Sequence, residues 1–151
     1  MHTVAVVALP DVIAFDLTTA VEVFGRVVLP SGERGYRVLV CGTESVVSAG
    51  PMRIATDHGI SEVDGADTIV VPGRNDVSVG TPGEVLRALK SAHADCTRIA
   101  SICSGAFTLA EAGLLDGKRA TTHWLAADLF RATYPEVDSI PTFSMSTRVR
   151  C

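Results

Sequence analysis

One cysteine stands in a sequence context that makes a thiol chemically active. Cys103 is followed by Ser104 and Gly105, and helix-forming residues continue over 107–112. The run 99–102 before it is typical of a buried strand, and Gly105 permits a sharp turn that a side chain would block. This order predicts a nucleophile elbow. Because backbone N–H groups and the helix dipole favour an anion there, we expect a lowered pKa and a reactive thiolate at Cys103.

A packing role is the alternative interpretation of Cys103. Free cysteine is among the most buried residue types and often behaves as a small hydrophobe. The position of a cysteine near a strand end therefore does not by itself indicate a chemical role. The Cys-Ser-Gly turn favours chemistry at this position.

The composition indicates one globular domain. The chain has 151 residues, of which 47% are hydrophobic and 20% are charged. A net charge of -4 without clustered Lys and Arg argues against direct DNA binding by this chain. The longest uncharged run, 99–110, is shorter than the about 20 residues of a membrane-spanning helix. No basic residue precedes Arg26, so we expect a cytoplasmic protein without a membrane segment.

The cysteines show no metal-binding or disulfide pattern. They lack CxxC spacing, so we expect reduced thiols, no metal and no cofactor. The four are Cys41, Cys96, Cys103 and Cys151.

Predicted strands and helices alternate along the chain. Thr81 and Glu84 have the spacing of a capping box, and Pro82 stands at the first helical position. These residues predict the start of a helix. The polar stretch between 41 and 67 has no clear pattern. We expect strands over 3–9, 36–41, 67–71, 98–102 and 119–122, and helices over 16–26, from 82 to about 92, 107–112 and 124–134.

This alternation predicts a three-layer α/β/α sandwich around a mostly parallel sheet. In such folds the site lies at the carboxyl ends of the strands. The residues that fall at those ends are Asp16, Gly73, Cys103 and His123.

Five motifs in order resemble those of the ThiJ/PfpI superfamily, which has a flavodoxin-like, type 1 glutamine amidotransferase-like fold. The resemblance covers about residues 2–137 and is strongest to the amino-terminal domains of GlxA-like AraC-family transcriptional regulators. The motifs are Phe15-Asp-Leu-x-x-x-x-Glu-Val-Phe24, Val70-Val-Pro-Gly73, Ala100-Ser-Ile-Cys-Ser-Gly-Ala-Phe107, Leu109-Ala-x-Ala-Gly-Leu-Leu-Asp-Gly117 and Ala120-Thr-Thr-His-Trp124.

The resemblance implies a partner for the cysteine. Cys103 matches the elbow cysteine of the superfamily, and Asp16 matches the acidic residue that faces it. A carboxyl group beside a thiolate is either protonated and bonded to sulfur or repels the anion, so the two groups titrate as a coupled pair. A plain helix-terminus carboxylate is the alternative interpretation of Asp16.

His123 is the candidate base, because the strand before it is expected to neighbour the elbow strand. Packing beside Trp124 is the alternative. Amidotransferases with a full triad place a carboxylate two residues after the histidine, whereas this chain has Leu125, so glutamine hydrolysis is not expected.

Two backbone N–H groups are candidate oxyanion donors, those of Gly73 and Ser104. The superfamily often has a second glycine where this chain has Arg74, so the loop that follows Gly73 is expected to differ in shape.

The resemblance ends before a divergent tail, residues 138–151. Eleven arginines against two lysines suggest a GC-rich gene, and a shifted reading frame of the tail gives Leu-Asp-Pro-Asp-Val-Leu-Tyr-Val-Asp-Glu-Gly, which is similar to the family's continuation. We therefore hypothesise a frameshift that removed the carboxyl-terminal part of the sensor domain and a DNA-binding domain. A genuinely short protein is the alternative. A truncated fold would expose apolar sheet surface.

Three functions follow from these residues. The first is a small-molecule-sensing domain of an AraC-family regulator. The second is a cysteine-dependent enzyme, either isonitrile-hydratase-like or an amidase or other hydrolase. The third is a redox sensor that acts through oxidation of Cys103. The resemblance also implies a homodimer.

Overall fold

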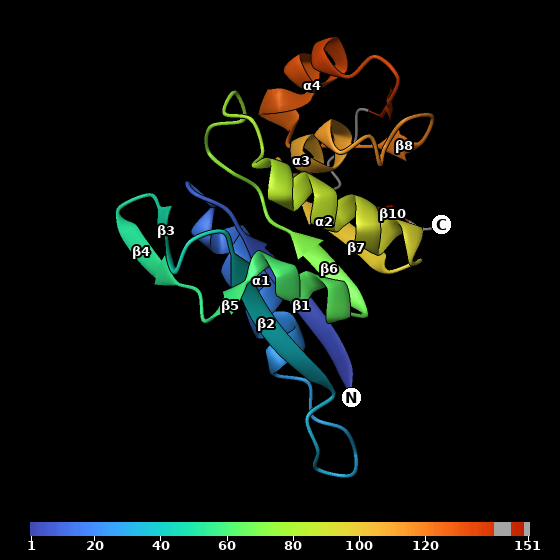
Figure 1. The fold of residues 1–151 in the computed structure, drawn as a ribbon. Helices are drawn as coiled ribbons and strands as arrows, with labels where there is room; N and C mark the ends of the chain where they lie inside the picture. Colours follow the sequence, from blue (N-terminus) through green and yellow to red (C-terminus); the bar gives the residue numbers. More distant parts are fainter. Residues whose placement is uncertain (141–145, 150–151) are drawn as a thin grey trace.

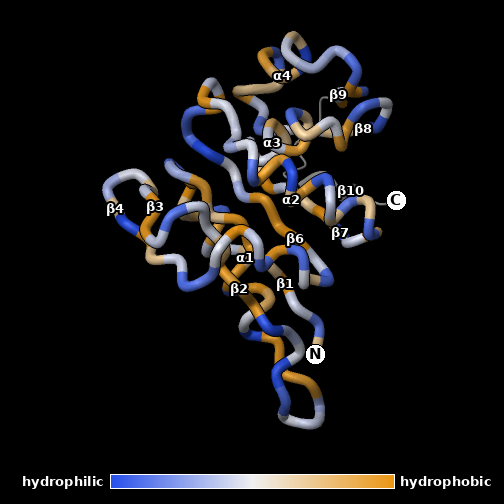
Figure 2. Tube along the Cα trace, in the orientation of Figure 1, coloured by the Kyte–Doolittle hydropathy of each residue, from blue (hydrophilic) through white to orange (hydrophobic). Residues whose placement is uncertain are grey.

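A run of β-branched residues at the amino terminus forms the centre of the sheet. In this computed structural model, which describes residues 1–140 and 146–149, β1 (His2–Ala8) is buried from Val4 onward. It pairs in parallel with β2 (Tyr36–Gly42) on one side and with β6 (Thr68–Val71) on the other. Strands covered on both faces are apolar throughout, and Figure 2 shows β6 as a continuous hydrophobic segment.

The sheet has the order β10-β7-β6-β1-β2-β5. β7 (Arg98–Ile102) and β5 (His58–Gly59) extend it in parallel, whereas β10 (Ser146–Val149) runs antiparallel to β7. The predicted fold class, a flavodoxin-like α/β sandwich with a mostly parallel sheet, is confirmed.

Helices cover both faces of the sheet, as Figure 1 shows. On one face, α1 (Ala14–Gly25) buries Leu17 and Ala20 against β1 and β6. On the other face, a larger core forms beneath α2 (Gly83–Ala94), α3 (Gly105–Glu111) and the 3-10 helix η1 (Ile60–Gly65). These layers bring the carboxyl ends of β1, β6 and β7 to one end of the molecule.

The polar stretch between 41 and 67 contains regular structure that the sequence pattern did not show. β3 (Val46–Ala49) and β4 (Met52–Ala55) form an antiparallel hairpin, and β5 and η1 follow. The hairpin turn contains Gly50 with φ of 58°, a conformation that suits glycine.

The predicted capping box at the start of α2 is wrong. Pro82 has ψ of 135° and therefore precedes the helix, and no side chain caps it. Thr81 is bonded to α3 instead, because its N–H donates to Glu111 at 3.0 Å and its hydroxyl to Thr108 at 3.5 Å. Contacts with another helix thus replace local capping.

The segment after α3 differs from the expected strand and single helix. β8 (Arg119–Ala120) pairs with β9 (Asp138–Ser139) in a separate ladder, while β10 occupies the edge of β7. The prediction that the strand before His123 neighbours the elbow strand is therefore wrong. The expected helix over 124–134 divides into η2 (Trp124–Ala126) and α4 (Ala127–Thr133).

An aromatic cluster attaches α4 to the core. Phe130 is fully buried and makes an edge contact with Phe107 of α3 at a ring distance of 5.0 Å. Tyr134 contacts both rings. This cluster fixes the position of the segment that carries His123.

The divergent tail lies partly outside the described residues, which leave out 141–145 and 150–151. Within the described residues, no helix combines the length and the hydrophobicity that a bilayer crossing requires.

Candidate functional site

The elbow forms where β7 passes into α3. Cys103 has φ of 56°, the left-handed region that costs energy for a residue with a side chain. The Thr122 hydroxyl donates to the Cys103 carbonyl at 3.3 Å, so the segment before His123 supports this backbone. The strained residue is thus the cysteine itself, whereas Gly105 is required for a different reason.

Gly105 lies against the end of β6. A Cβ atom there would stand 2.1 Å from the Val71 carbonyl oxygen and 2.9 Å from that of Pro72. Only glycine lets the first turn of α3 approach this backbone. The close approach places Cys103 beside the loop that begins with Gly73.

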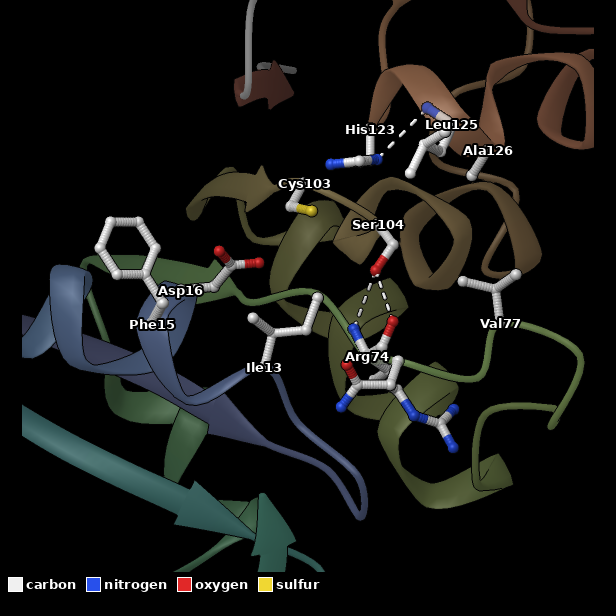
Figure 3. A pocket seen from close by; sticks show the side chains of 11 residues that line it. Ile13, Phe15, Asp16, Arg74, Val77, Cys103, Ser104, His123, Leu125 and Ala126 are labelled. Carbon is white, nitrogen blue, oxygen red and sulfur yellow. Dashed lines mark hydrogen bonds between the residues drawn. The ribbon is translucent and has the colours of Figure 1, made fainter. Parts of the chain in front are cut away.

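Asp16 faces the elbow from the first turn of α1. The residue is 4% exposed, and its carboxyl group accepts the Gly73 N–H at 3.1 Å. Figure 3 shows the carboxyl group turned toward the cysteine. Burial raises the pKa of Asp16, against the opposing effects of the Gly73 N–H, the Cys103 thiol and the charge of His123.

The pKa of Cys103 is raised above its usual 9.0. Burial of the side chain is the main cause, and the negative charge of Asp16 adds to it. The Ser104 backbone and side chain act in the opposite direction and are outweighed. The expectation of a lowered pKa is therefore wrong, because desolvation and a neighbouring carboxylate exceed the favourable dipoles of the elbow.

His123 reaches the same pocket from the start of η2. Its Nδ1 accepts the Leu125 N–H at 3.3 Å, and its ring stacks on Trp124 at 5.8 Å. In the neutral ring the proton therefore sits on Nε2. Among the hydrogen bonds of the described residues, His123 has none to Cys103, so its influence on the pair is electrostatic, through Asp16.

The two predicted oxyanion donors both serve the Asp16–Cys103 pair. The Gly73 N–H donates to Asp16, and the backbone of Ser104 stabilises the sulfur anion. A Cβ atom on Gly73 would stand 2.7 Å from both Asp16 Oδ2 and Ser104 Oγ, so a side chain here would displace these two groups. An oxyanion on a ligand would share these N–H groups with the side chains.

These residues surround an open pocket of about 510 Å³. Its mouth is apolar, since Phe15 and Leu125 are 70% and 72% exposed. Among the described residues, no group of three or more His, Cys, Asp or Glu side chains is arranged to hold a metal ion. The lining consists of Ile13, Phe15, Asp16, Arg74, Asn75, Val77, Cys103, Ser104, His123, Leu125 and Ala126 (Figure 3).

The structure places four of the predicted site residues in one pocket, Asp16, Cys103, Ser104 and His123, and the fifth, Gly73, donates its N–H to Asp16. The sequence prediction did not name every residue of the site. It missed Thr122, although this residue precedes His123 within a quoted motif. It also missed the apolar walls, because nothing in the sequence shows which loops meet above the elbow.

Comparison with known proteins identifies the family of the chain. The sequence model of the DJ-1/PfpI family matches residues 2–141. A protein from the cpoL 5′ region of Streptomyces lividans is 35% identical over 125 residues, which cover 82% of this chain and 88% of that protein.

Two further relatives are named for a function. The HTH-type transcriptional regulator CdhR of Pseudomonas aeruginosa is 32% identical over 103 residues, 68% of this chain but 30% of the regulator. Isonitrile hydratase of Pseudomonas putida is 41% identical over 76 residues, 50% of this chain and 32% of the enzyme. The chain therefore matches about a third of the length of either.

Solved structures share the fold. Drosophila melanogaster DJ-1beta superposes with a TM-score of 0.77 at 20% identity, covering 95% of this chain and 75% of that one. An AraC family transcriptional regulator from Pseudomonas putida gives a TM-score of 0.73 at 18% identity, covering 94% and 77%.

Proposed function

The chain belongs to the DJ-1/PfpI family, and we propose that it is a small-molecule-sensing domain of the kind found at the amino terminus of AraC-family regulators. The pocket around Cys103 carries this proposal. Its volume of about 510 Å³ is within the usual range for small-molecule sites. Apolar side chains line its walls, and Asp16, Cys103 and His123 offer polar groups that orient a ligand.

The state of the thiol supports sensing over catalysis. A nucleophilic cysteine acts as the thiolate, and burial together with Asp16 opposes that form here. An activated thiol also needs a base within hydrogen-bonding reach. The Nδ1 of His123 accepts a backbone N–H, and position 125 is a leucine. The site therefore holds a ligand more readily than it attacks one.

A cysteine-dependent enzyme is the second candidate, and the presence of Asp16 and Cys103 in the same pocket favours it. A nucleophile and a neighbouring proton donor are the minimum for an isonitrile-hydratase-like reaction or a hydrolysis. Redox sensing has weaker support, because a buried thiol with a raised pKa oxidises slowly.

The family resemblance supports a homodimer with a cytoplasmic location. The net charge of -4 supports DNA contacts made outside these 151 residues.

We expect ligand binding without turnover. The full chain is screened against small metabolites by thermal unfolding, and the same compounds, isonitriles and amides are tested for conversion. A ligand at a hundredfold excess over its Kd should raise the Tm of the wild type by roughly 5–10 °C. Cys103→Ala removes the polar floor and should reduce that shift, whereas Cys96→Ala, which changes an exposed cysteine, should leave it intact.

Two results would decide against sensing. One is conversion of an isonitrile or amide by the wild type that Cys103→Ala abolishes, which would establish the enzyme. The other is a library in which no compound shifts the Tm of the wild type.

A further inference from the structure

A buried arginine of the pocket lining is held mainly by backbone carbonyls. Arg74 is 8% exposed, and its guanidinium hydrogen bonds go to the carbonyl oxygens of Pro10 and Val79. Asp76 is an acidic group coupled to it, since the charge of Arg74 adds to the Ser78 hydrogen bonds in lowering the pKa of Asp76. A buried charge whose hydrogen bonds go to neutral groups is costly, so its position requires an explanation. Within the described residues, the ion pairs of arginine involve Arg26, Arg119 and Arg131.

The guanidinium connects two loops that are far apart in sequence. Its Nε donates to Pro10 at 3.1 Å, and its Nη1 donates to Val79 at 3.0 Å. The planar fork of arginine presents these two donors at a fixed separation. A lysine has a single nitrogen at its tip and cannot hold the same two acceptors in this geometry.

The backbone of Arg74 is fixed to the elbow at the same time. The Ser104 hydroxyl accepts the Arg74 N–H at 2.9 Å and donates to the Arg74 carbonyl at 2.8 Å. The neighbouring Gly73 carbonyl accepts the Ile13 N–H at 2.8 Å. Arg74 is therefore the point at which the elbow and both loops meet.

A second set of hydrogen bonds, made by Asp11, joins the same two loops. Asp11, with φ of 63°, accepts the Asn75 side-chain amide at 3.1 Å and the Asp76 N–H at 3.1 Å. Loops with this many hydrogen bonds hold a defined shape. The segments 10–13 and 74–79 thus form one unit.

This unit contributes two apolar side chains to the pocket. Ile13 comes from the first loop and Val77 from the second, and both line the pocket that contains Cys103. Figure 3 shows these two side chains on opposite sides of Arg74, with the guanidinium turned away from the sulfur. Arg74 therefore acts on the width of the pocket rather than on the chemistry of the thiol.

We propose that Arg74 is a positioning residue that sets the width of the pocket and hence the size of ligand it admits. The inference rests on the proposed ligand pocket, but the width is measurable without any ligand. Two alkylating reagents with the same reactive group, iodoacetamide and iodoacetamidofluorescein, compare small and bulky access to Cys103. Mass spectrometry of the Cys103 peptide gives the rate constant for each.

Arg74→Lys should raise the bulky-to-small rate ratio about fivefold, the factor expected from one lost hydrogen bond, and Arg74→Met, which loses both bonds, should raise it by at least as much. Arg87→Met, which removes an exposed arginine of α2, should leave the ratio of the wild type. Leu89→Ala, which weakens the core beneath α2 without removing a hydrogen bond of the two loops, should do the same while lowering the Tm.

Three outcomes would overturn the proposal. The first is an unchanged rate ratio in both Arg74 variants. The second is a wild-type ratio in Arg74→Lys alone, which would show that the charge matters and the planar fork does not. The third is an equal rise of the ratio in Leu89→Ala, which would show a general loosening of the protein. Arg74→Lys retains the charge and serves if Arg74→Met does not fold. A failed ligand screen with a changed ratio would reject the sensing function and leave the role of Arg74 standing.

Discussion

Adding one methyl group at Gly105 is expected to lower the free energy of unfolding by about 3 kcal/mol or more. The added Cβ would overlap the Val71 carbonyl oxygen at 2.1 Å. That oxygen belongs to the backbone of β6 in the core of the sheet, so it has no freedom to move aside. Either α3 shifts and loses its packing, or the elbow distorts.

Gly25→Ala is the matched control for Gly105→Ala. Gly25 ends α1 and has nothing within 4 Å of a built Cβ, so alanine there should be neutral or stabilise by about 0.5–1 kcal/mol. Urea unfolding of both variants gives the comparison. Equal midpoints for Gly105→Ala and Gly25→Ala would show that α3 does not approach β6 as closely as described.

Replacing Asp16 by asparagine is expected to change the thiol most. Asparagine keeps an oxygen for the Gly73 N–H but removes the negative charge beside the sulfur. Because that charge adds to burial in raising the pKa of Cys103, the pKa of Cys103 should fall in Asp16→Asn. Alkylation of Cys103 by iodoacetamide should therefore begin at a lower pH than in the wild type.

The same substitution should also alter the pH dependence of stability. The pKa of Asp16 is raised in the folded state above its usual 3.8, so the folded protein holds this proton where the unfolded chain has lost it. Stability from this group is then lost as pH rises from the unfolded pKa through the folded one. Asp16→Asn lacks this loss. The free energy of unfolding of the variant, relative to that of the wild type, should therefore be higher at neutral pH than at acidic pH.

Both effects of Asp16→Asn are measured on one sample, by a pH series of alkylation rates and of urea midpoints. Asp128→Asn is the control, because this carboxylate is exposed on α4. An alkylation profile that does not move in Asp16→Asn would mean that Asp16 does not govern the thiol. A wild-type stability profile would mean that its pKa is not raised.

The sheet and its helices were predictable because burial on both faces leaves a plain pattern. The apolar runs of β1 and β6 admit few polar residues, and the helices between them place apolar residues at helical spacing. The hairpin of β3 and β4 was not predictable in this way. β3 buries two of its four residues and β4 buries none, and both strands are too short for a clear period.

The ladder of β8 was also beyond the sequence. Two residues with ordinary strand character do not specify a partner, and the partner here is β9, some 20 residues along the chain. His123 still lies at the pocket, since the Thr122 hydroxyl donates to the Cys103 carbonyl without a shared sheet edge.

The meeting of Asp16, Cys103 and His123 in one pocket was predictable, but the direction of the thiol pKa shift was not. Residue types show that Cys103 precedes a helix, and this favours a thiolate. They do not show that Cys103 is 8% exposed, nor how strongly Asp16 acts on its pKa. Desolvation depends on which loops cover a group, and Ile13 and Val77 come from loops that the sequence does not place.

A titration of the single thiol at Cys103 tests the central claim most directly. Thiolate absorbance is followed against pH for the wild type and for Cys103→Ala, and the difference isolates this cysteine from the other three. A buried thiol beside Asp16 in a ligand pocket predicts a midpoint above the usual 9.0. A midpoint clearly below 9.0 would contradict it and would identify an activated nucleophile instead.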